Sequence, residues 1–79
     1  MTSTQMAQRL SEAALRYRET GSDAALLELE ALARSAAVHV GRSGQGTVDH
    51  IVLSGTLRLI VVDVPGLEPV LRKSGWSWL

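Results

Sequence analysis

Apolar residues in the first part of the chain recur at the spacing of an α-helix. The pattern i, i+4, i+7, i+8, i+11 is typical of a helix with one buried face, and it is formed here by Met6, Leu10, Ala13, Ala14 and Tyr17. Thr2 and Gln5 are three residues apart, which is the spacing of a capping box. The sequence therefore predicts a helix over about 3–20.

A second helical pattern follows almost immediately. Gly21 has the position of a left-handed C-cap, and Ser22 that of the next N-cap. The second predicted helix covers about 23–37 and carries apolar residues on two faces, so we expect it to pack against two neighbours. Because the connection between the two helices is so short, they should form an antiparallel hairpin.

Beyond residue 46 the apolar residues become dense and mostly β-branched, which favours strands. We expect strands over about 47–53 and 56–64, joined by a two-residue hairpin turn at Ser54 and Gly55. Strand alternation then places one apolar set on a face that the helices do not cover. We predict that this face mediates self-association through Ile51, Leu53, Ile60 and Val62.

The last segment, about 67–79, is predicted to form a short helix or a strand. Pro69 fits the first turn of a helix and weakens a strand. Helices in one run followed by strands in another indicate an α+β fold in one small domain spanning 1–79. The expected architecture is an antiparallel helical hairpin, then a β-hairpin or three-stranded antiparallel sheet, then the C-terminal element.

Composition adds an expectation about assembly. The 79 residues include no cysteine or phenylalanine, and eight basic residues balance eight acidic ones. A domain of this size buries only about 60% of its unfolded surface, and no disulfide adds stability. We therefore expect a homodimer. Balanced charge also removes the strong positive field that non-specific nucleic-acid binding uses.

Two further features bear on location. The longest apolar runs, such as 59–62, are far shorter than the roughly 20 residues that cross a bilayer. The first residues lack the basic and apolar regions of a signal peptide. We therefore expect no membrane interaction and a cytoplasmic protein.

The sequence offers little for catalysis. The only histidines, His39 and His50, have no metal-binding spacing. The glycines within 41–46 lack the ending of a phosphate-binding loop, and no serine nucleophile elbow occurs. We predict no catalytic residues, no metal site, no cofactor and no enzymatic activity.

Cationic and aromatic residues gather near the C-terminus. Tryptophan and arginine are over-represented among residues that dominate binding energy, so we predict a partner-binding patch of Arg72, Lys73, Trp76 and Trp78. Alternatively, the tryptophans belong to the core and cover the open face of the hairpin. The sequence thus predicts an interaction protein that acts as an inhibitor, adaptor or regulator of a larger protein or complex, such as a phage-encoded inhibitor of a bacterial defence or transcription system. The other candidate is a small nucleic-acid-binding regulatory protein that uses the same patch.

Overall fold

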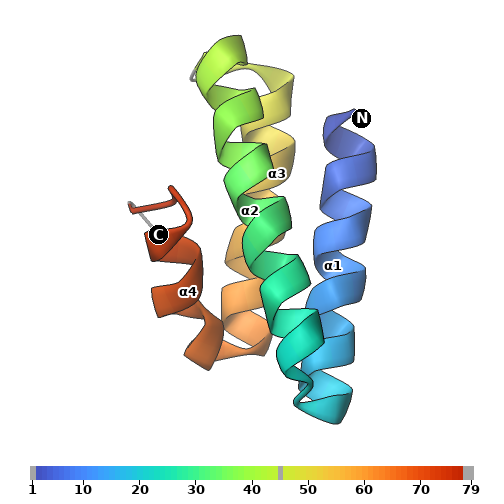
Figure 1. Cartoon of the computed structure of the whole chain (residues 1–79). Coiled ribbons are helices and arrows are strands. Elements are labelled where there is room, and N and C mark those ends of the chain that lie inside the picture. The colour runs from blue at the N-terminus through green and yellow to red at the C-terminus, as the bar shows by residue number, and fades with distance from the viewer. Residues whose placement is uncertain (1, 45, 78–79) are drawn as a thin grey trace.

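The computed structural model describes residues 2–44 and 46–77, and these form an all-helical fold (Figure 1). Three long helices, α1 (Ser3–Thr20), α2 (Asp23–Ser43) and α3 (Val48–Asp63), pack side by side. A single 3₁₀ turn, η1 (Pro65–Leu67), leads into the short helix α4 (Glu68–Lys73). Since no strand occurs within the described ranges, the predicted α+β fold class is wrong.

Local sequence signals position α1. The Thr2 side chain accepts a hydrogen bond from the backbone N–H of Gln5, and the Gln5 side chain accepts one from the backbone N–H of Thr2. This reciprocal cap satisfies two backbone donors that have no partner inside the helix. At the other end, Gly21 adopts φ 65°, a left-handed conformation that glycine takes without steric cost.

The second helix is longer than the pattern predicted, because α2 continues past residue 37 to Ser43. The alternation of Val38, His39 and Val40 resembles a strand, but Val40 extends the buried helical stripe of the preceding alanines. Tertiary packing of that stripe outweighs the weak intrinsic preference of valine for strands.

The predicted strands over 47–53 and 56–64 are replaced by one continuous helix, α3. Thr47 caps its first turn by accepting a hydrogen bond from the backbone N–H of His50, at 3.3 Å. The helix runs through Ser54 and Gly55, where the sequence indicated a hairpin turn. Its inner face has helical spacing and is buried in the bundle through Leu53, Leu57 and Ile60.

Contacts at both ends of the bundle fix how α3 lies against α1. Ser3 donates a hydrogen bond to Asp49 at one end, and Arg18 pairs with Asp63 at 2.7 Å at the other. Each pair joins residues about 45 positions apart, so α1 and α3 run parallel, with α2 antiparallel to both (Figure 1). The core between the helices is aliphatic and rich in alanine, which allows close helix approach.

The C-terminal segment closes one side of this bundle. Trp76 is the largest fully buried side chain, 1% exposed, and its indole Nε1 donates to the Ala33 carbonyl at 3.0 Å. Leu67 and Leu71 are buried in the same core. Figure 1 shows this segment beside α2, on the side away from α1. Trp76 was predicted as a partner-binding residue; its side chain lies instead in the core.

Gly75 makes that closure possible. It has φ 109°, and a Cβ atom at this position would lie 2.8 Å from the Cβ of Ala37. Both the backbone conformation and the close contact with α2 therefore require glycine.

Candidate functional site

Helix α3 carries a second apolar face, directed away from the bundle. Val48, Ile51, Leu59 and Val62 are 75, 63, 71 and 78% exposed. At 3.6 residues per turn, these side chains and Gly55 lie within about one quarter of the helix circumference. We call this set of five residues the outer face of α3.

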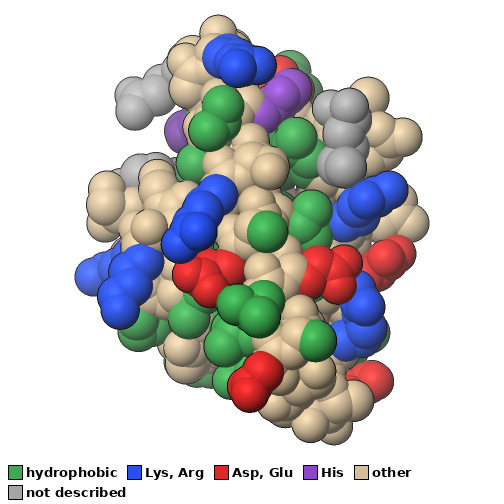
Figure 2. Space-filling model, in the orientation of Figure 1, with side chains coloured by type: hydrophobic (Ala, Val, Ile, Leu, Met, Phe, Trp, Pro, Cys, Tyr) green, Lys and Arg blue, Asp and Glu red, His purple; other side chains and the backbone are tan. Residues whose placement is uncertain are grey.

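Elsewhere, exposed apolar residues are scattered. Leu15 on α1 and Leu27 and Val38 on α2 are the other exposed large hydrophobic residues among those described. Figure 2 shows hydrophobic side chains interspersed with charged ones on the surface that α2 occupies. Isolated exposed leucines and valines are ordinary in proteins, whereas a contiguous apolar patch marks an interaction site. The outer face of α3, with four exposed aliphatic residues on one helix, is the candidate for such a patch.

A groove between α1 and α3 borders this patch. It is open to solvent, has a volume of about 350 Å³, and is lined by Ser11, Ala14, Leu15, Thr56, Leu59, Ile60 and Asp63. Leu59 belongs to both the groove and the outer face, and Leu15 forms part of the opposite wall. The apolar surface therefore extends from α3 towards α1.

The predicted self-association residues do not lie on one surface. Ile51 and Val62 are exposed on the outer face of α3, whereas Leu53 and Ile60 are buried in the core. Strand alternation groups residues two positions apart, but a helix places such residues about 200° apart. The set predicted from the sequence is therefore divided between the two faces of α3.

The C-terminal patch is also divided. Arg72 pairs with Glu68 on the same helix, with Nη2 to Oε1 at 2.7 Å, and Lys73 is exposed in the last turn. Trp76 is buried, so it does not present an aromatic surface beside these cations. Trp78 lies outside the described residues.

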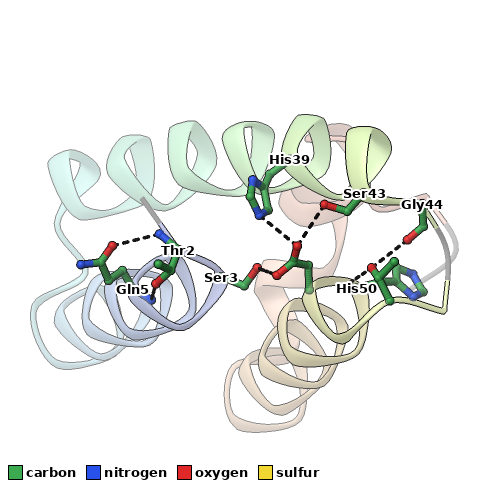
Figure 3. Close-up of polar contacts among 9 residues, drawn as sticks. Thr2, Ser3, Gln5, His39, Ser43, Gly44 and His50 are labelled. Carbon is green, nitrogen blue, oxygen red and sulfur yellow. Dashed lines mark hydrogen bonds and ion pairs between the residues drawn. The ribbon is translucent and has the colours of Figure 1, made fainter.

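A polar cluster around Asp49 joins three helix ends (Figure 3). Its carboxylate accepts hydrogen bonds from the hydroxyls of Ser3 on α1 and Ser43 on α2, the latter at 3.0 Å. Nε2 of His39 lies 3.4 Å from Asp49 Oδ2 but makes no hydrogen bond to it, so the two interact as an ion pair only when the imidazole is protonated. The serine hydroxyls, Ser3 first and then Ser43, hold the pKa of the Asp49 carboxyl below its ordinary value.

The hydrogen bonds of the Asp49 cluster differ from those of a catalytic triad. In a catalytic triad the histidine takes the proton of the serine, whereas both serines here donate to the carboxylate. Within residues 2–44 and 46–77, no three His, Cys, Asp or Glu residues are placed to hold a metal ion. The cluster connects the ends of α1, α2 and α3.

Sequence reasoning missed both features. The Asp49 cluster joins residues up to 46 positions apart, which no local pattern reveals. The outer face of α3 does have a local signal: Val48, Gly55 and Val62 are spaced by seven residues, the repeat of a helix face.

Comparison with protein-family models, curated proteins and solved structures gives no match. In the part of the chain that the structure describes, no helix is both long enough and apolar enough to span a membrane.

Proposed function

We propose that this chain is a protein-binding domain that contacts its partner through the outer face of α3. One observation carries the proposal: four large aliphatic side chains, each more than three-fifths exposed, lie together on one face of a single helix. Amphipathic helices bind proteins through such anchors at helical spacing. The role as an inhibitor, adaptor or regulator that the sequence suggests stays a prediction.

The energetics favour this use of the face. Burying an exposed valine, leucine or isoleucine contributes roughly 1.5–3 kcal/mol each as an upper value. Helix α3 is already formed by its inner contacts with α1 and α2. A partner would therefore meet a preformed surface, and less of the binding free energy is lost in ordering it.

The nucleic-acid alternative has weaker support. Such sites combine cations with exposed aromatic rings on which bases stack. Trp76 is buried, and the Arg72 guanidinium is paired with Glu68. The proposal of a non-enzymatic protein-binding role is therefore preferred, and the cytoplasmic location expected from the sequence stays a prediction.

Site-specific photo-crosslinking in the native host tests the proposal. A photoreactive phenylalanine analogue would replace Leu59 on the outer face of α3 or, as a matched control, Leu27 on α2, which is 65% exposed. We expect a discrete protein adduct from position 59 and none from position 27. The same adducts from both positions, or none from position 59, would contradict the proposal.

A further inference from the structure

The outer face of α3 is symmetric about Gly55. Val48 and Val62 lie seven residues on either side of it, and Ile51 and Leu59 lie four residues on either side. Two antiparallel helices related by a two-fold axis place residues that are equidistant from that axis at the same level. An axis at Gly55 would thus set valine level with valine and isoleucine level with leucine.

We propose that this face binds the same face of a second copy of the chain, as two antiparallel α3 helices that cross at Gly55. This inference rests on the proposed function and names the partner. It differs from the predicted self-association surface, because Leu53 and Ile60 lie in the core of each copy and the outer face supplies the contact.

Within the described structure, neither backbone conformation nor packing requires a glycine at position 55. Glycine inside a helix is less stable than alanine because it has more conformational freedom to lose on folding. Its backbone has no positive φ, and apart from the adjacent backbone of α3 no atom of the described residues lies within 4 Å of where its Cβ would be. A second helix that crosses at this point gives the glycine a function, since the absence of a side chain lets two backbones approach closely.

The area fits a second copy. Side chains of this size with the observed exposures present roughly 500 Å² of apolar surface, a value typical of a functional patch. If these side chains were fully covered, two copies together would bury about 1,000 Å² from them alone, which is about the minimum for a biological interface. Leu15, 44% exposed across the groove from Leu59, adds to the contact.

Charge does not oppose this pairing. The five residues of the outer face are uncharged, so covering the face buries no unpaired charge from them. Arg58 stands at the edge of the face. There its aliphatic stem can lie along the second helix while the guanidinium stays in water.

The absence of native cysteine allows a direct test of the geometry by disulfide cross-linking. Val48→Cys and Val62→Cys change two exposed side chains, and thermal melts would verify that each variant keeps the fold. After oxidation of the full chain, we expect a covalent dimer from an equimolar mixture of the two variants and none from either variant alone. In the antiparallel pair each position lies about 10 Å from the axis along the helix, so identical positions are too far apart for a disulfide.

Four results would overturn the inference. Each variant cross-linking with itself would indicate a parallel pair. No cross-link above that of a Val62→Cys and Leu27→Cys control mixture would indicate no specific contact. A photo-crosslink from position 59 to a different protein, together with no disulfide dimer, would retain the proposed function and remove self-pairing. Adducts and dimers both absent would remove the two proposals together.

Discussion

Two apolar surfaces of the bundle differ in whether another part of the chain covers them. Along α2 and the inner side of α3, the C-terminal segment supplies Leu67, Leu71 and Trp76, and each is at most 1% exposed. On the outer face of α3, no described residue of the chain covers Val48 or Val62. A short chain has few apolar residues from which to build a core. That four large ones remain in water supports the proposal that another molecule covers this face.

The largest expected difference in stability is between substitutions of two leucines that are two residues apart. Leu57 is fully buried and Leu59 is 71% exposed. Leu57→Asp places an unpaired charge in the core. The free energy of unfolding should fall by an amount on the order of 5 kcal/mol, which is comparable with the total stability of a small domain. Leu59→Asp should leave the fold of the monomer intact within about 0.5 kcal/mol.

Circular dichroism and chemical denaturation would compare the two leucine variants. If α3 were a strand, both leucines would lie on one face and the two substitutions would act alike. Similar losses of stability would therefore contradict both the helix and its two faces.

Removal of the covering tryptophan should have the next largest effect. Trp76→Ala leaves a cavity and removes the hydrogen bond to the Ala33 carbonyl, so we expect a loss of about 3–5 kcal/mol in the free energy of unfolding. Trp76→Phe keeps most of the packing and should cost less. Urea denaturation measures the free energy of unfolding of both variants. A loss below about 1 kcal/mol for Trp76→Ala would show that the C-terminal segment does not stabilise the core.

Two glycines should respond with opposite signs. Gly75→Ala forces a Cβ into a positive-φ site against Ala37 and should destabilise the fold by about 1–3 kcal/mol. Gly55→Ala enters open space in a helix and should stabilise the monomer by about 0.5–1 kcal/mol. The same Gly55→Ala change should weaken self-pairing, because the added methyl group lies at the crossing point.

The measurement for the glycine pair is unfolding of dilute protein combined with a self-association assay. The proposed role of Gly55 would be refuted if Gly55→Ala left self-association unchanged or strengthened it.

Low pH should remove the contribution of the Asp49 cluster to stability. Because hydrogen bonds from Ser3 and Ser43 keep the folded-state pKa of Asp49 below its ordinary value of 3.8, the carboxylate contributes stability above that value. This contribution is lost as pH falls through the folded-state pKa. We expect the melting temperature of wild type to exceed that of Asp49→Asn at pH 6 and the difference to shrink below pH 3.8. A difference that is constant with pH would exclude this role.

How far the sequence predicts this fold depends on how many faces each helix buries. Local sequence signals are sufficient to predict α1, which has a single apolar stripe, a capping box and Gly21 as its C-cap. In α3 both faces are apolar, so no polar stripe reveals the 3.6-residue period. Valine and isoleucine also favour strands, and Ser54 and Gly55 imitate a hairpin turn.

The candidate site was predictable only in part. Ile51 and Val62 were identified as residues that need a cover, but strand alternation grouped them with Leu53 and Ile60. The sequence does not decide whether Trp76 belongs to the core or to a binding patch, because its burial depends on a contact with Ala33, 43 residues away. Local patterns carry no information about such long-range contacts.

Sedimentation of the wild-type chain over a wide range of concentration tests the central claim most directly. The monomer has a mass of 8.5 kDa. We predict reversible conversion to twice that mass as concentration rises, and a Leu59→Asp variant that self-associates on the order of 100-fold more weakly, because the pair would bury its charge. A wild-type chain that sediments at 8.5 kDa up to the highest concentration, with Leu59→Asp indistinguishable from it, would contradict the pairing of two outer faces.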